Sequence, residues 1–417
     1  MRLRLLAVAV AATVAGLAVG AGVGTAVPTE NAAAYWSGVA APAISAGRAP
    51  ASGQVLAGIV HAAIYDAVAA TAGGLEPFMA SPQVVEGALP DAAVAKAARD
   101  VLVARVPAQA GIVDAAYASF IGGIPNSQAK TDGIAAGAAV AAQILALRAN
   151  DGFNNVVTFV QPTPGPGVFE PFSLPPVDVH LQQVTPYTYD SPSDFDPGPP
   201  VSLKSGEYAA SFEEVKAYGG TNADTLRTQA QTDTARFYTE NPYVQYTRML
   251  RWLVGTEQLD LRDTARLLGL AHVGAADSQI ACWWAKYHYN FWRPTHAIQR
   301  ADTDGNHKTA AANWTHLITG NHPEYPSGHG CETGGITEAI RRFFHNDRVR
   351  LEITSTATPT APARVYERLS DLRDEVTNAR VWGGLHFRST MEETYKVPNR
   401  VVAHVAAHHF RETHGNK

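Results

Sequence analysis

Three separated segments of the chain carry basic and histidine residues at spacings suited to holding an anion. In KYHYNFWRP, Lys286 and Arg293 are about two helical turns apart, so a helix would place both on one face. In ARVWGGLHFR, Arg380 continues an apolar stripe and His386 follows two glycines. A guanidinium on such a stripe requires an anion or a group of carbonyl oxygens. The glycines break the helix, which allows Arg380 and His386 to face one point.

The segment PEYPSGHG, residues 323–330, predicts a second kind of anion contact. If Ser327 caps the following helix, the N–H groups of Gly328 and its neighbours lie at the positive end of that helix. Gly328 permits close approach of a ligand to the backbone, and His329 can transfer a proton beside it. Taken singly, each segment also has a structural interpretation: cations that reach water, or a capped turn with an exposed histidine. Together they provide the charges, fixed donors and imidazoles that a tetrahedral or trigonal-bipyramidal oxyanion needs.

These motifs carry a family resemblance. Lys-x6-Arg-Pro, Pro-Ser-Gly-His and Arg-x5-His stand here as Lys286 to Pro294, Pro326 to His329 and Arg380 to His386. This pattern resembles the type 2 phosphatidic acid phosphatase and vanadium haloperoxidase superfamily. The sequences VHAAIYDAV and RVWGGLHFRS, with a Pro-rich middle, resemble its secreted bacterial vanadium-dependent haloperoxidase branch. The likeness runs from about residue 30 to the C-terminus.

The resemblance implies a catalytic assignment for each matching residue. His386 would bond vanadium, or attack phosphorus in a phosphatase. The oxygens of vanadate or phosphate would be bound by Lys286, Arg293, Ser327, Gly328 and Arg380. His329 would act as acid and base, and Lys286 would polarise peroxide. Trp283 would line the pocket. His322 takes a position where bromide-oxidising relatives resemble one another in carrying histidine, which favours bromide or iodide.

Two positions depart from the family pattern. Ala379 stands where a serine usually precedes the arginine, and Thr390 stands where an aspartate usually supports the second histidine. Loss of that aspartate argues against phosphatase chemistry and leaves the support of His386 open. Glu392 or Glu393 could replace it.

The resemblance therefore implies a vanadate-dependent haloperoxidase. Such an enzyme uses hydrogen peroxide to oxidise a halide and halogenates a small organic acceptor. An acid phosphatase acting through a phosphohistidine is the main alternative. A secreted helical protein that binds oxyanions without turnover is a third.

Helical periodicity dominates the chain that must position these residues. Helices are predicted, with strand signals almost absent, over 53–70, 91–105, 132–149, 243–256, 261–292, 328–345, 364–380 and 391–413. In 364–380 the expected apolar stripe is Val365, Leu369, Leu372 and Val376. The fold class is therefore all-α, with helical bundles forming one large domain.

Between two helical parts, residues 161–203 contain eleven prolines. Proline at this density excludes helix and central strand. We expect a long ordered loop over the surface, or a linker between two halves. The aromatic residues in this segment favour the packed loop.

The first 26 residues have the composition of a secretory signal peptide. Arg2 and Arg4 precede an Ala/Val/Leu/Gly run and small residues near Ala26. We expect residues 27–417 to form a secreted catalytic domain, with an uncleaved membrane anchor as the alternative. No later segment is expected to span a bilayer.

Charge and cysteine content limit the partners. Without residues 1–26 the chain has 31 Lys and Arg against 38 Asp and Glu, a formal charge of −7, and no basic run typical of nucleic-acid binding. Cys282 and Cys331 lie beside the motifs, either bridged or as two buried thiols. The oligomeric state stays open.

Overall fold

Helices build most of the described chain, which is residues 30–413 of a computed structural model. The predicted signal peptide, residues 1–26, lies outside the described residues. The helices are α1 (Ala32–Ser45), α2 (Pro50–Ala72), α3 (Pro90–Arg105), α4 (Ala110–Gly122), α5 (Gln128–Leu147), α6 (Gly206–Tyr218), α7 (Gln229–Phe237), α8 (Pro242–Thr256), α9 (Leu261–Tyr289), α10 (Pro294–Gln299), α11 (Gly328–Phe344), α12 (Leu369–Trp382), α13 (Arg388–Thr394) and α14 (Lys396–His408). Two short antiparallel strands, β1 (Leu351–Ile353) and β2 (Arg364–Tyr366), pair Leu351 with Tyr366. The predicted all-α class is confirmed.

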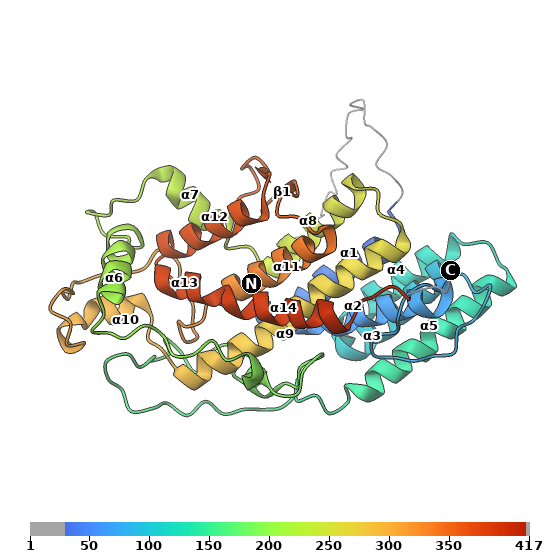
Figure 1. Ribbon diagram of the computed structural model, residues 1–417, viewed down its shortest axis with the longest axis horizontal. Helices are drawn as coiled ribbons and strands as arrows, with labels where there is room; N and C mark the ends of the chain where they lie inside the picture. The colour runs from blue at the N-terminus through green and yellow to red at the C-terminus, as the bar shows by residue number, and fades with distance from the viewer. Residues whose placement is uncertain (1–29, 414–417) are drawn as a thin grey trace, which may run out of the picture.

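Helix α9 runs through the centre of the molecule and belongs to both of its parts (Figure 1). On one side α2 packs along α9, and α3 and α5 pack on α2. On other sides of the same stretch of α9, α11 and α14 pack against it, with α12 beyond α11. A side chain on α9 can therefore be buried by both parts at once.

Specific residues fix the ends and the close packing of α9. Asp260 caps it by accepting a hydrogen bond from the N–H of Asp263, and Asn290 ends it in a left-handed conformation. A side chain at Gly335 of α11 would lie 2.8 Å from the Cα of Ala275, so glycine permits the two helices to touch. Cys282 and Cys331 form a disulfide that joins α9 to α11, which settles the open question of their pairing.

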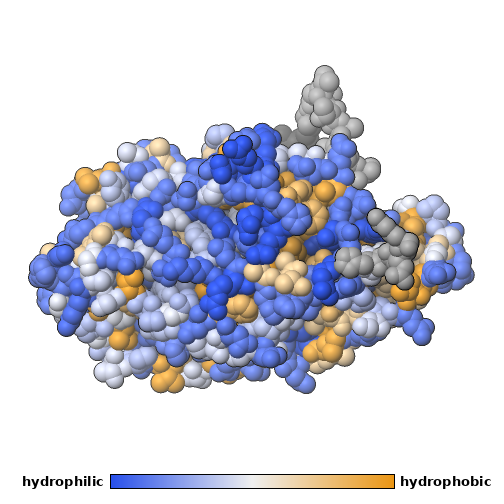
Figure 2. All heavy atoms as spheres, in the orientation of Figure 1, coloured by the Kyte–Doolittle hydropathy of each residue, from blue (hydrophilic) through white to orange (hydrophobic). Residues whose placement is uncertain are grey.

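One expectation about membrane-spanning segments needs correction. Helix α2 is long and apolar enough to cross a bilayer, although no segment after the signal peptide was expected to be. However, 89% of its most apolar window is buried inside the protein. Its apolar side chains are therefore used in the core, and the face in Figure 2 is largely hydrophilic with separate apolar patches.

The Pro-rich segment is a packed loop that lies along α9. Between α5 and α6 the chain has only two short 3₁₀ turns, Val179–Gln183 and Pro192–Phe195, and both contact α9. Buried Asp277 of α9 accepts hydrogen bonds from the N–H of Tyr187 at 2.7 Å and from the hydroxyl of Thr188 at 2.6 Å. The loop follows the lower edge of the molecule in Figure 1. A buried carboxylate thus anchors the segment to the central helix.

Two helix predictions differ from the structure. Residues 364–366 form β2, so Val365 is 46% exposed and does not belong to the apolar stripe, which starts with Leu369 of α12. The predicted helix 391–413 is divided into α13 and α14. Pro398 explains the division, because a proline is tolerated best in the first turn of a helix and Pro398 lies in the first turn of α14.

Candidate active site

The three motifs meet at a cavity of about 190 Å³. Helices α9 and α11, the end of α12 and the loops before α11 and α13 form much of its walls, together with the starts of α2 and α8 and part of the Pro-rich loop. The predicted residues on its lining are Trp283, Arg293, His322, Gly328, His329, Arg380 and His386. Gly384, with φ +74°, provides the turn after α12 that brings Arg380 and His386 to one cavity, as the glycine pair predicts.

The N-terminus of α11 forms one wall. The hydroxyl of Ser327 accepts a hydrogen bond from the N–H of Gly330 at 3.2 Å, and the Ser327 N–H donates to the hydroxyl of Thr394 at 2.9 Å. Gly328 is the first helical residue, so its N–H has no acceptor within the helix. A side chain at Gly328 would come within 2.8 Å of the Trp283 ring. Glycine is therefore required here for two reasons: it gives a ligand access to the backbone, and it leaves room for the Trp283 ring.

Arg380 and His329 present buried polar atoms that lack a partner among the described residues. Arg380 donates from Nη1 to the carbonyl of Tyr238 at 2.9 Å, but its Nε has no acceptor there. The Nε2 of His329 is likewise without a partner in that part of the chain. Both residues line the cavity. Because unpaired buried polar atoms are costly, they fit a site whose ligand is an oxyanion.

Arg293 ties the loops of the site together. It donates to the carbonyl of His322 at 2.7 Å and to that of Leu385 at 2.9 Å, and its Nη2 lies 2.8 Å from the Nδ1 of His322. The His322 ring also lies against Trp283, with ring centroids 5.3 Å apart. The two predicted pocket residues therefore form one corner of the cavity with Arg293.

Lys286 is buried behind the loop that precedes α11. Its ammonium donates to the carbonyl oxygens of Pro323 at 2.8 Å, Glu324 at 3.2 Å and Pro326. It is not among the residues that line the cavity in the described chain, and neither is Ser327. The structure thus places both residues beside the cavity, with their polar atoms engaged by the backbone.

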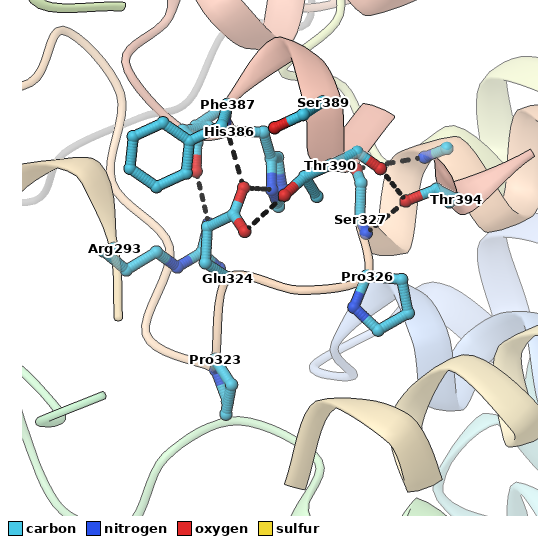
Figure 3. A network of polar contacts seen from close by, with 12 residues as sticks. Arg293, Pro323, Glu324, Pro326, Ser327, His386, Phe387, Ser389, Thr390 and Thr394 are labelled. Atoms are coloured by element: carbon cyan, nitrogen blue, oxygen red, sulfur yellow. Dashed lines mark hydrogen bonds and ion pairs between the residues drawn. The ribbon is translucent and has the colours of Figure 1, made fainter. Parts of the chain in front are cut away.

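His386 contacts a carboxylate that the sequence analysis did not identify. Its Nδ1 lies 3.0 Å from Oε1 of Glu324, and Oε2 of Glu324 accepts a hydrogen bond from the Thr390 hydroxyl at 2.7 Å (Figure 3). The suggestion that Glu392 or Glu393 replaces the family aspartate is wrong. Glu392 is exposed, and Glu393 pairs with Lys396 at 2.6 Å.

Burial controls the charge states in the cavity. It lowers the pKa of His322, His329 and His386 well below the ordinary range, and nearby arginines lower each further, so the three imidazoles are neutral. Burial also lowers the pKa of Arg293 to about 10 and of Arg380 to about 9. Both guanidiniums remain charged at neutral pH and can neutralise an anion.

A second pair of polar residues on the lining was also not predicted. The Nε2 of Gln279 donates to Oε2 of Glu332 at 2.9 Å and to the carbonyl of Gly328 at 3.0 Å. Burial raises the pKa of Glu332 to about 8, so this carboxyl is largely uncharged at neutral pH. The sequence did offer a signal for Gln279 and Glu332, because each is a polar residue within a predicted helix, one turn from a motif residue.

The C-terminal helices also match a known protein family. Residues 266–415 match the family model of the second helical-bundle domain of vanadium chloroperoxidase. Vanadium chloroperoxidase of Curvularia inaequalis is 29% identical over 107 residues, which are 23% of this chain and only 17% of the relative's length.

Solved structures extend the likeness to most of the chain. A bacterial vanadium-dependent iodoperoxidase superposes with a TM-score of 0.77 at 20% identity, covering 92% of this chain and 97% of its own. A holo-type bacterial vanadium-dependent chloroperoxidase gives 0.70 at 16% identity, covering 86% and 92%. At such low identity these likenesses show the fold. Residues 266–415 thus match a domain of vanadium chloroperoxidase, and the chain as a whole shares the fold of bacterial vanadium-dependent haloperoxidases.

Proposed function

We propose that this protein is a vanadate-dependent haloperoxidase that uses hydrogen peroxide to oxidise a halide and so halogenates small organic acceptors. One observation carries the proposal. The cavity combines two buried arginines with three neutral histidines, and the Nε of Arg380 and Nε2 of His329 lack partners among the described residues. This donor set suits an oxyanion whose centre can also bond to an imidazole nitrogen.

The residues present fit vanadate. Arg293, Arg380 and the N–H of Gly328 would hold its oxygens, and Nε2 of His386 would bond the metal, because Nδ1 faces Glu324. When bound, vanadate supplies a Lewis-acid centre that activates peroxide without changing its own oxidation state. Burial lowers the pKa of Lys286 well below its ordinary value; in its charged form it would contribute positive potential from behind the loop formed by residues 323–326.

His329 is the acid and base in this proposal. As a neutral imidazole it could accept a proton from hydrogen peroxide that enters the cavity and pass that proton to a hydroxyl oxygen of the bound oxyanion, which would leave as water. Burial and the neighbouring Arg380 and Lys286 favour loss of that proton, because they disfavour a positive charge on the imidazole.

Bromide or iodide is the proposed halide. His322 occupies the cavity corner next to Trp283 and Arg293, so the position that suggested these halides does line the cavity. One similar solved structure is named an iodoperoxidase, and others are named chloroperoxidases. We also propose that residues 27–417 act as one secreted catalytic domain after removal of residues 1–26.

Acid phosphatase activity remains the second candidate because of Glu324. Absence of the family aspartate at Thr390 argued against a nucleophilic histidine. Glu324 supplies a carboxylate to Nδ1 of His386 from another segment, which removes that argument.

Paired assays on residues 27–417 would separate the candidates. Metal-free protein, before and after addition of orthovanadate, is tested for bromide- and iodide-dependent halogenation of a dione and for hydrolysis of p-nitrophenyl phosphate. We expect halogenation only with vanadate, and its loss in His386→Ala. Hydrolysis by the metal-free protein that vanadate inhibits, without halogenation, would overturn the proposal in favour of a phosphatase.

A further inference from the structure

Glu324 and Thr390 form a small polar network around His386. Besides its contact with Nδ1 of His386, Oε1 of Glu324 accepts a hydrogen bond from the N–H of Phe387 at 3.0 Å. Oε2 accepts from the hydroxyl of Thr390 at 2.7 Å (Figure 3). Glu324 is fully buried and His386 is 2% exposed. Both carboxylate oxygens are thus engaged, and solvent does not compete for them.

These contacts determine which nitrogen of His386 carries the proton. A neutral imidazole has one N–H and one nitrogen lone pair. Burial raises the pKa of Glu324 to about 7, and in its ionised form the carboxylate can only accept hydrogen bonds. Its Oε1, which already accepts the N–H of Phe387, then accepts from Nδ1 as well, so Nδ1 is the protonated nitrogen when Glu324 is ionised. The lone pair is then on Nε2, the nitrogen that is free to bond a ligand in the cavity.

The network also reaches the other wall of the cavity. Thr394 donates from its hydroxyl to the carbonyl of Thr390 at 2.6 Å and accepts the N–H of Ser327 at 2.9 Å. The residue that replaces the family aspartate therefore connects His386, through Glu324, with the N-terminus of α11. Lys286 fixes the opposite side of the loop by donating to the carbonyl of Glu324 at 3.2 Å.

We propose that Glu324, held by the Thr390 hydroxyl, is the positioning residue that keeps His386 in its Nδ1–H form with Nε2 available to the cavity. The pair thereby divides between two segments what one aspartate does elsewhere: the glutamate supplies the carboxyl group and the threonine orients it. This inference deepens the proposed function and rests on it where vanadate is concerned. The tautomer of His386 can be measured without vanadate or turnover.

The decisive variants exchange the carboxylate between the two positions. Glu324→Ala removes it, and Glu324→Ala with Thr390→Asp returns it to the position where the family carries it. Thr390→Val keeps the volume but removes the hydroxyl that orients Glu324. Glu393→Gln is the matched control, because this carboxylate lies one turn from Thr390 and pairs with Lys396 instead.

Two quantities are measured on each folded variant. Nitrogen-15 chemical shifts of protein with labelled histidines report the tautomer of His386, and calorimetric titration with orthovanadate reports affinity. We expect a single Nδ1–H form in the wild type and in Glu393→Gln. Glu324→Ala should mix the tautomers and weaken vanadate binding by on the order of 10–100-fold. Thr390→Val should weaken it by a smaller factor, and the double variant should recover both properties.

The results separate two kinds of failure. If Glu324→Ala or, where that variant does not fold, Thr390→Val leaves the tautomer and affinity unchanged, the positioning assignment is wrong. It is also wrong if the wild type shows the Nε2–H form. If the wild type has the Nδ1–H form but no halogenation activity, the proposed function fails while the assignment of Glu324 stands.

Discussion

Gly328 is held to glycine by its contact with an aromatic ring. An added Cβ would lie 2.7 Å from the Trp283 ring, which cannot yield as the end of a flexible side chain could. We expect Gly328→Ala to lower the free energy of unfolding by about 1–3 kcal/mol, the usual cost of overpacking, and to weaken vanadate binding because Trp283 lines the cavity. Urea unfolding and vanadate titration would measure the two effects.

Gly255 of α8 offers the control. Nothing lies within 4 Å of an added Cβ there, so Gly255→Ala should be neutral or stabilise by about 0.5–1 kcal/mol, as in an open helix. Equal stability and affinity of Gly328→Ala and the wild type would show that the Trp283 contact is not restrictive.

Glu332 should make stability depend on pH in a direction opposite to that of a paired carboxylate. Its pKa rises from 4.5 to about 8 on folding because the carboxyl is buried. The protonated form is favoured by the fold, so the contribution is fully present below about pH 4.5 and is lost as pH rises to about 8. We expect the uncharged Glu332→Gln to gain stability relative to the wild type over this window, by up to about 1.4 kcal/mol per pH unit.

Unfolding midpoints of both proteins at pH 5 and pH 8 would measure this. The comparison cancels other groups that titrate in the same range, since the two chains differ at one carboxyl only. A difference that stays constant between the two pH values would contradict the raised pKa.

The sequence was sufficient to predict the cations and histidines of the site, but not their partners. Motif spacing identified Arg293, Arg380 and His386, because each stands at a fixed distance from another residue of its own segment. Glu324 was missed because its contact with His386 joins segments 62 residues apart. The one signal for Glu324 in the sequence was that it is the only acidic residue in PEYPSGHG, a stretch without lysine or arginine.

Among the elements, α9 and α11 contribute Gln279, Trp283, Gly328, His329 and Glu332 to the cavity lining and are joined by the disulfide between Cys282 and Cys331. The bond lies next to Trp283 on one helix and next to Glu332 on the other. Its loss should lower stability by about 2–4 kcal/mol and weaken vanadate binding, because α9 and α11 can then shift against each other. Urea unfolding and vanadate titration with and without reductant would test this.

A chain with both Cys282→Ala and Cys331→Ala serves as the control for the reductant. It should behave like the reduced wild type, and reductant should not change it further. If reduction of the wild type alters neither property, the packing of α11 on α9 is sufficient without the bond.

Element boundaries were predictable where one periodic pattern filled the helix, as in α3 and α8. They were not predictable where a tertiary contact overrides the pattern. Val365 has the spacing of an apolar stripe, yet it pairs with Glu352 across a short antiparallel ladder. Likewise, α1 was missed although Asn31 caps it, because its mostly small residues show no strong period.

For the whole molecule, α9 makes the two helical parts one unit. The family match begins at residue 266, inside α9, and the stacked rings of His61 on α2 and His272 on α9 lie between the parts, 3.8 Å apart. We expect residues 27–417 to unfold in a single calorimetric transition, and residues 266–415 alone to lack cooperative unfolding, because the α2-facing side of α9 would be exposed. Two separate transitions of the longer chain would contradict this.

The ammonium of Lys286 stabilises the loop beside the anion site from within the protein. Three backbone carbonyl oxygens accept hydrogen bonds from it, as oxygen atoms would surround a bound monovalent cation. Lys286 of α9 therefore holds the loop that bears Glu324 as a bound potassium ion would, except that this cation is part of the chain. Because this loop needs no ion from solution, the geometry around His386 should not change with the ionic composition of the solvent.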